Sequence, residues 1–136
     1  MDQAVERCLL SVDDSVRCES PRGFEVAKEL GSIRALMPLL QYESGEVFEL
    51  DEYIEDASYF AGLYSTTVSI RFSCFGKLFS IFDLTNVDPA FASRIVEFIS
   101  KHGYTYVPAE VLDTEYTGSN PHLKGTTWWV RYFDYL

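Results

Sequence analysis

The side chains best suited to chemistry in this chain are carboxylates gathered in one segment. The sequence contains no lysine or arginine between Arg34 and Arg71. Within that interval lie seven acidic residues: Glu43, Glu46, Glu49, Asp51, Glu52, Glu55 and Asp56. Aromatic residues are interleaved with them: Tyr42, Phe48, Tyr53, Tyr59, Phe60 and Tyr64. Because no cation close in sequence neutralises these carboxylates, they repel one another and lower stability unless something compensates.

Two interpretations of this acidic aromatic segment remain open. It could be a solvated face that keeps the protein soluble, or a docking surface for a basic protein. In a docking surface the carboxylates would steer the approach of the partner, and buried tyrosines would anchor it. We predict partner-binding residues at Glu46, Glu49, Asp51, Glu52, Tyr53, Glu55, Asp56 and Tyr59. A calcium site is the weaker hypothesis, because the D-x-[DN]-x-[DN]-G loop pattern is missing.

Motifs that would name a reaction are absent from the sequence. There is no glycine-rich phosphate loop, no GxSxG and no HExxH. The polar loop over residues 116–125 contains His122, which could act as a general base oriented by Asp113 or Glu115. A structured polar turn has the same composition. We therefore predict no catalytic residue, no metal site and no cofactor.

The remaining candidate groups have structural explanations. His102 falls at the last turn of a predicted helix, where the helix dipole favours a cation. The three cysteines, Cys8, Cys18 and Cys74, contain no CxxC pair, which favours reduced thiols in a cytosolic protein.

Length and charge exclude several classes of protein. A chain of 136 residues fits one domain. Its net charge is −10, of which residues 1–56 carry −9 and residues 57–136 carry −1. Nucleic-acid backbones and anionic membrane surfaces both require a basic surface, so we expect neither as a direct partner. The sequence has no run of 18 apolar residues, and acidic residues precede its first apolar patch, so we expect a cytoplasmic protein without a membrane span or secretory signal.

The N-terminal part of the chain predicts helices. Apolar residues at helical spacing predict a helix over residues 2–13: Val5, Cys8, Leu9 and Val12. Ser20 followed by Pro21 is typical of the start of a second helix, and Gly31 is typical of its end. Pro38 argues against an uninterrupted helix through residues 33–42. We expect residues 43–56 to form a loop, with one helical turn over residues 51–56.

The rest of the chain predicts a sheet and one packed helix. Alternating apolar and polar residues predict a strand over residues 68–74, which forms a hairpin with the apolar run 78–84 and follows a strand within 59–67. Asp88 and Pro89 open a helix over residues 88–102. Its apolar stripe consists of Phe91, Ala92, Ile95, Phe98 and Ile99.

A strand over 104–107 returns to this sheet. We expect a terminal strand over 127–136, in which at least one of Trp128 and Trp129 is buried. The predicted fold class is α+β: N-terminal helices, a central antiparallel β-sheet and one amphipathic helix packed on a sheet face.

The C-terminal segment, residues 116–136, resembles the ends of some small bacterial immunity proteins. It runs from Tyr116-Thr117-Gly118 through Lys124-Gly125-Thr126-Thr127-Trp128-Trp129-Val130 to Leu136. These proteins are cytosolic antitoxins of contact-dependent inhibition and related polymorphic-toxin systems. The class has no shared catalytic motif, so the resemblance assigns no site residue.

What the resemblance implies is a role. Such a protein binds one cognate toxin domain, often a nuclease, and blocks or distorts its active site. The acidic composition fits this role, because a nuclease presents a basic cleft to phosphate. We therefore expect a non-enzymatic inhibitor of a basic nuclease toxin. The alternatives are a small enzyme or ligand-binding domain that uses the 116–125 loop, and a nucleic-acid mimic.

Overall fold

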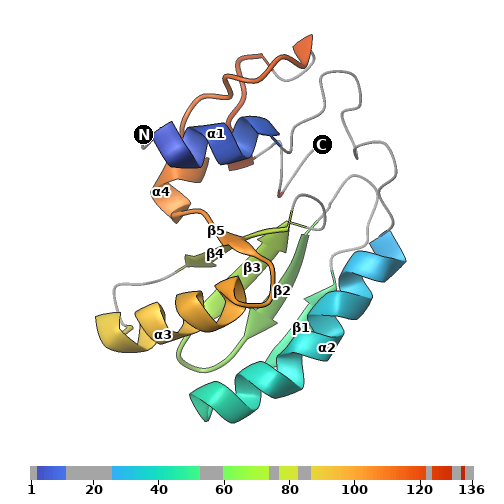
Figure 1. Ribbon diagram of the computed structural model, residues 1–136, viewed down its shortest axis with the longest axis vertical. Helices are drawn as coiled ribbons and strands as arrows, with labels where there is room; N and C mark the ends of the chain where they lie inside the picture. The colour runs from blue at the N-terminus through green and yellow to red at the C-terminus, as the bar shows by residue number, and fades with distance from the viewer. Residues whose placement is uncertain are drawn as a thin grey trace.

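A five-stranded sheet forms the centre of the molecule in a computed structural model of the chain (Figure 1). The structure describes residues 3–11, 26–52, 60–73, 77–82, 87–121, 124–129 and 133. The strands lie in the order of the chain: β1 (Glu49–Glu52), β2 (Phe60–Tyr64), β3 (Ser69–Ser73), β4 (Leu78–Phe82) and β5 (Thr105–Tyr106). The first four strands pair antiparallel. β5 pairs parallel with β4, because a helical crossover joins them.

Within the described ranges, four helices accompany the sheet: α1 (Gln3–Ser11), α2 (Val26–Ser44), α3 (Pro89–Ser100) and α4 (Ala109–Leu112). The fold is therefore α+β, as the sequence predicts. The expected helix over residues 2–13, the β3–β4 hairpin, the preceding strand β2 and the returning strand β5 are all confirmed. In the described part of the chain, no helix is both long enough and apolar enough to cross a membrane.

One face of the sheet carries the main hydrophobic core. The strand register places six buried side chains on this face: Ala61, Leu63, Ile70, Phe72, Phe79 and Ile81. The helices α2 and α3 cover it, and they also contact each other (Figure 1). α3 inserts Ile95 and Ile99, with the rest of its predicted apolar stripe partly buried beside them. The Asp88 carboxylate accepts a hydrogen bond from the Ala90 backbone N–H at 3.0 Å, which confirms the predicted cap of α3.

A second core lies at the other end of the molecule, where α1 and α4 meet the C-terminal segment (Figure 1). Leu9, Leu112, Trp128 and Phe133 are fully or almost fully buried there, together with Leu78 of β4. Leu78 belongs to this core, whereas its neighbours along β4 on the opposite face belong to the first. β4 is therefore covered on both faces, which is why its sequence is a continuous apolar run rather than an alternation.

The prediction that Gly31 ends the second helix is wrong. α2 is 19 residues long and passes through both Gly31 and Pro38 before it ends at Ser44. Its buried side chains occur on both sides of Pro38, with Ile33 and Leu36 before it and Leu40 after it, and they hold one face of the helix against the sheet. Pro38 is exposed, so the carbonyl that loses its helical partner is placed where water can reach it. The start of this helix at Ser20 lies outside the described residues.

Two further predictions are corrected by the structure. Residues 49–52 form the edge strand β1 rather than a loop and helical turn, because Leu50 and its neighbours pair with β2. Trp128 and Trp129 lie in a helical turn rather than in a strand, and the Phe133 N–H donates to the Trp129 carbonyl at 2.8 Å. The chain enters this turn through a single bridge between Glu115 and Thr127. Burial of at least one tryptophan is confirmed, since Trp128 is fully buried.

Candidate functional site

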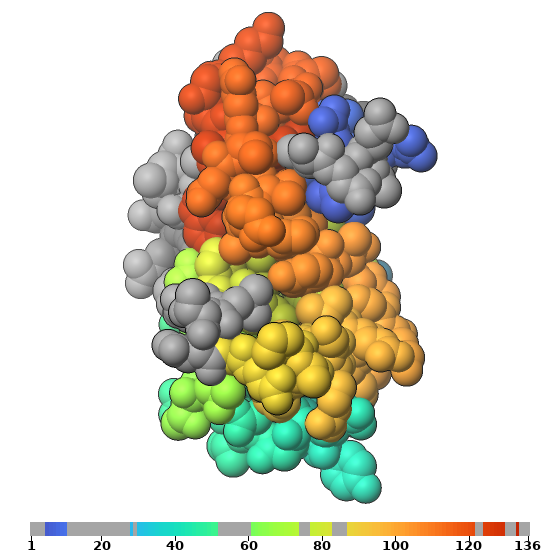
Figure 2. Space-filling model, turned by 90° about the vertical axis from the view of Figure 1, so that its left-hand side faces the viewer, coloured from blue at the N-terminus to red at the C-terminus, as the bar shows by residue number. Residues whose placement is uncertain are grey.

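Four of the seven carboxylates between Arg34 and Arg71 lie where α2 ends and β1 begins. We call Glu43, Glu46, Glu49 and Asp51 the acidic edge. The segment forms one end of the elongated molecule, opposite α1 and α4 (Figures 1 and 2). α2 ends at Ser44, and the next residue, Gly45, has a φ of 75° and donates its N–H to the Gln41 carbonyl at 2.9 Å. This left-handed residue turns the chain from the last turn of α2 into the edge strand.

Side chains hold this turn in a defined shape. The Gln41 side-chain oxygen accepts a hydrogen bond from the Phe48 N–H at 2.9 Å, and Phe48 is buried in the core. The Ser44 hydroxyl donates to the Leu40 carbonyl at 2.7 Å and accepts from the Glu46 N–H at 3.2 Å. The backbone that carries the acidic edge is therefore bonded back to α2.

The carboxylates of the acidic edge differ in exposure. Glu43 and Glu49 are exposed, while Glu46 and Asp51 are partly buried. One Glu46 oxygen accepts a hydrogen bond from the Ser65 hydroxyl at 3.2 Å, which ties this carboxylate to the turn between β2 and β3. By register Glu49 and Asp51 lie on the sheet face opposite the one covered by α2 and α3.

Neutralising contacts at the acidic edge are scarce. No salt bridge joins these four carboxylates to any residue that the structure describes. The Arg94 guanidinium contacts only the backbone here, where it donates to the Glu43 carbonyl at 3.1 Å. Within the described ranges, no three acidic, histidine or cysteine side chains converge as a metal site. The acidic edge is thus a group of exposed and partly exposed negative charges.

Two tyrosines stand beside the acidic edge. Tyr42, in the last turn of α2, is 91% exposed. Tyr64 lies opposite Glu49 in the register, and its ring covers Gly62, which is opposite Asp51. A Cβ at Gly62 would come within 2.5 Å of the Tyr64 hydroxyl oxygen, so glycine is what allows the ring to lie against β2. These rings give the acidic edge apolar area as well as charge.

The structure brings only part of the predicted docking set together. Glu46, Glu49 and Asp51 share one edge with Glu43, which extends the predicted set along α2. Glu52 ends β1, but its side chain lies outside the described part, as do Tyr53, Glu55, Asp56 and Tyr59 entirely. Tyr42 and Tyr64 were not among the predicted contacts. Tyr42 was missed because the sequence argued for a break at Pro38. A helix that continues through Pro38, as the observed one does, has Tyr42 on its exposed face.

The alternative site in the 116–125 loop has the contacts of a structured turn. Tyr116 is buried, and its hydroxyl accepts a hydrogen bond from the Asn120 N–H at 3.0 Å. The Tyr116 N–H donates to the Thr126 carbonyl at 2.9 Å, which closes the loop at its base. Asp113 and Glu115 are exposed. His122, the candidate base, lies outside the described residues.

His102 and the cysteines add no catalytic arrangement to the described residues. His102 is exposed, and its Nδ1 donates to the Phe98 carbonyl at 2.9 Å. Cys8 is a partly buried thiol that forms no disulfide with a described residue, and Cys18 and Cys74 lie outside the described part. Among the described residues, Tyr106 is in a perturbing environment: burial first, and the Glu110 carboxylate second, raise the pKa of its phenol.

Comparison with known proteins gives no relative on which to base a function: no protein-family model, curated protein or solved structure matches the chain.

Proposed function

We propose that this protein is a cytoplasmic bacterial immunity protein that binds and neutralises a basic toxin domain, of the nuclease class. The acidic edge is the proposed docking surface. The observation that carries the proposal is the set of exposed or partly exposed carboxylates at one end of the molecule, with no salt bridge to a described residue. Such a group lowers stability by self-repulsion unless a positively charged partner compensates it.

The chemistry of a nuclease makes it a suitable partner. A nuclease binds phosphate through lysine and arginine, so its active cleft is basic and attracts a group of carboxylates as it attracts a nucleic-acid backbone. In this proposal Glu49 and Asp51 contact the rim of that cleft, and their charge accelerates association. Tyr42 supplies an aromatic anchor, because tyrosine buries a large area and loses little conformational entropy. The bound protein then excludes nucleic acid from the cleft.

The deciding experiment tests this protein against the product of the gene adjacent to its own, if that gene encodes a toxin-like domain. We expect the two purified proteins to form a complex and nuclease activity to fall in proportion to complex formation. A variant carrying Glu43→Gln, Glu49→Gln and Asp51→Asn should associate about tenfold more slowly at low salt, because steering of this kind changes association rates by ~10–10³. Raised salt should slow the wild type toward the same rate.

A matched control separates a local effect from a change in net charge. The variant Glu110→Gln, Asp113→Asn and Glu115→Gln removes the same three charges from exposed positions at the opposite end of the molecule. It should associate at nearly the wild-type rate and protect toxin-exposed cells fully. Equal slowing in both variants would show that only net charge matters, and a salt-independent rate would refute steering by the acidic edge.

The proposed role of Tyr42 as an anchor has a separate test. Tyr42→Ala should weaken the complex by about 2 kcal/mol, or roughly thirtyfold in Kd, if the ring is desolvated on binding. Because Tyr42 is 91% exposed in the free protein, the change should leave the melting temperature nearly unaltered. An unchanged Kd would remove Tyr42 from the interface.

A further inference from the structure

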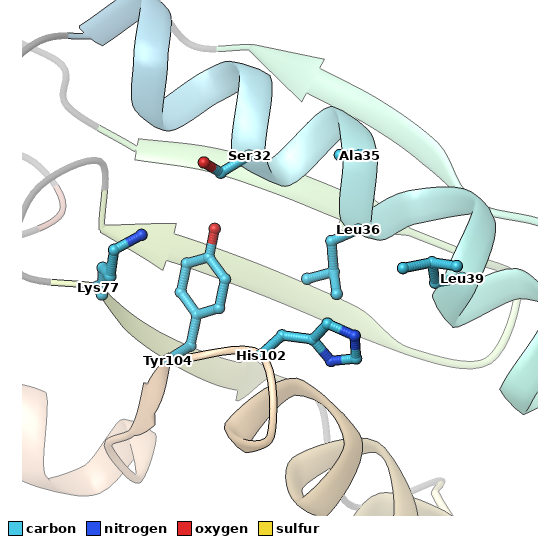
Figure 3. Close-up of a pocket in the computed structure, with 7 residues that line it drawn as sticks. All are labelled: Ser32, Ala35, Leu36, Leu39, Lys77, His102 and Tyr104. Carbon is cyan, nitrogen blue, oxygen red and sulfur yellow. The ribbon is translucent and has the colours of Figure 1, made fainter.

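A small cavity opens between α2 and the segment that joins α3 to β5, away from the acidic edge. Its volume is about 260 Å³. One wall comes from α2, and the other comes from the start of β4 and from the two residues around Gly103 (Figure 3). The volume lies just below the ~300–1,000 Å³ of pockets that hold drug-sized ligands, so an occupant must be a small molecule.

Polar tips gather at one end of this cavity. Figure 3 shows the Lys77 ammonium, the Tyr104 hydroxyl and the Ser32 hydroxyl turned toward the same part of it. The Lys77 nitrogen lies 5.1 Å from the centre of the Tyr104 ring, which keeps the cation at this end. The Lys77 ammonium supplies a positive charge, which suits an anionic group such as a carboxylate, and the Tyr104 hydroxyl lies beside it. The Ser32 hydroxyl borders this end of the cavity and donates its proton to the Lys28 carbonyl at 3.2 Å.

The remaining wall is apolar. It is formed by Ala35, Leu36 and Leu39 of α2, and Leu39 is 51% exposed although it is a large aliphatic residue. The His102 ring lies below these side chains. Its centre is 4.6 Å from that of the Phe98 ring, at a tilt of 50°, and the hydrogen bond from its Nδ1 holds it in place. A ligand that covered Leu39 would remove this apolar surface from water.

The backbone at Lys77 places the ammonium at an energetic cost. Lys77 has a φ of 51°, in the left-handed region that non-glycine residues seldom occupy. The residue sits at the turn into β4, where its exposed side chain lines the mouth of the cavity (Figure 3). Asparagine tolerates this backbone conformation better than lysine and carries no charge, which makes it a suitable replacement.

We propose that this cavity binds a small monocarboxylate with a short aliphatic chain, whose carboxylate meets the Lys77 ammonium beside Tyr104 and whose chain lies on Leu36 and Leu39. The proposal is independent of the acidic edge and of its partner. A phosphate monoester fits less well, because a dianion would meet only one fixed cation here.

The test uses the intact protein labelled with ¹⁵N and three probes of graded chemistry. Hexanoate carries both the charge and the chain, hexanamide carries the chain without the charge, and acetate carries the charge with almost no chain. We expect hexanoate to shift the amide signals of Ser32, Lys77 and His102, and to bind at least tenfold more tightly than either of the other two. Lys77→Asn should weaken hexanoate binding at least tenfold, whereas Lys124→Asn, an exposed lysine outside the cavity, should not.

The thermal melt of each variant checks that the fold is retained. Equal binding of hexanoate and hexanamide, unchanged binding by Lys77→Asn, or no shift of these amides up to the solubility limit of hexanoate would each overturn the proposal. Tighter binding of acetyl-alanyl-leucine than of hexanoate would also overturn it, because the cavity would then recognise a peptide C-terminus rather than a free acid. None of these results depends on whether the acidic edge binds a toxin.

Discussion

At Gly45 the chain leaves α2 with a φ of 75°, while Gly31 lies on the exposed side of the same helix. Neither glycine has any atom within 4 Å of the place where a Cβ would stand. A methyl group is therefore sterically free at both positions, and only the backbone conformation distinguishes them. Gly45 needs the left-handed region, and Gly31 is a helix interior residue in which glycine is a poor choice.

The two alanine substitutions should therefore act in opposite directions. Gly31→Ala should raise the free energy of unfolding by about 0.5–1 kcal/mol, because alanine loses less backbone entropy in a helix. Gly45→Ala should lower it by about 1–2 kcal/mol, the cost of a left-handed conformation for an L-residue. Urea unfolding measures both. A destabilised Gly31→Ala variant would contradict the continuous helix α2.

A second residue-scale effect concerns Tyr106. Burial first, and the Glu110 carboxylate second, raise its pKa above the ordinary value of 10.0. The folded state therefore keeps the phenol proton at a pH where the unfolded chain has lost it. This contribution to stability is present below pH 10 and is lost as the pH rises from about 10 through the raised pKa.

We expect the wild type to lose more stability than Tyr106→Phe between pH 9 and 11, because phenylalanine has no proton to lose. The other tyrosines titrate in both proteins, so the difference between the two urea midpoints isolates Tyr106. Glu110→Gln should reduce the pH dependence slightly, since it removes the smaller of the two causes. A constant difference across this pH range would show that the Tyr106 pKa is not raised.

At the scale of an element, the C-terminal helical turn places its two tryptophans in different surroundings. Trp128 is fully buried, with its ring 4.8 Å from that of Tyr116 in an edge-on contact. Trp129 is only partly buried and stacks on Phe133 at 5.1 Å, with the Arg71 guanidinium 5.4 Å from its ring centre. Adjacent residues in a helical turn point about 100° apart, so both rings can contact the protein without equal burial.

Trp128→Ala should lower the free energy of unfolding by about 3–5 kcal/mol, the usual cost of removing a large aromatic side chain from a core. Trp129→Ala should cost less, because its ring is partly exposed and leaves a smaller cavity. Chemical unfolding of the two variants gives the comparison. Equal losses, or a larger loss for Trp129→Ala, would contradict this difference in burial.

At the scale of the whole molecule, two cores meet on one strand. β4 presents Phe79 and Ile81 to the core under α2 and α3, and Leu78 to the core under α1 and α4. Loss of either core therefore exposes one face of β4 and removes part of the support of the other core. This shared strand argues for one cooperative unit rather than two that unfold separately.

Coincident unfolding transitions would confirm that the two cores unfold as one cooperative unit. Both tryptophans lie in the second core, so their fluorescence reports on that end of the molecule. Far-ultraviolet circular dichroism is dominated by the long helices α2 and α3, which cover the first core. We expect the two signals to give the same urea midpoint. Fluorescence that changes at lower urea than the circular dichroism would show that the cores unfold independently.

The sequence by itself determined the elements that are stabilised locally. The alternation around Ile70 and Phe72 and the cap at Asp88 predicted the hairpin and α3, because side-chain periodicity and capping are properties of neighbouring residues. The concentration of carboxylates before Arg71 is likewise visible in the chain alone. These features allowed the α+β class and an acidic candidate site to be predicted.

Only the tertiary structure decided what depends on distant partners. α2 passes through Pro38 because burial of its inner face against the sheet outweighs one missing hydrogen bond. β1 forms from residues with low strand propensity because its backbone pairs with β2. The same contacts decided that Glu43, Glu49 and Asp51 share one end of the molecule, and that Lys77 reaches a cavity beneath α2. Local sequence does not contain these outcomes, because the energies that decide them come from residues far away in the chain.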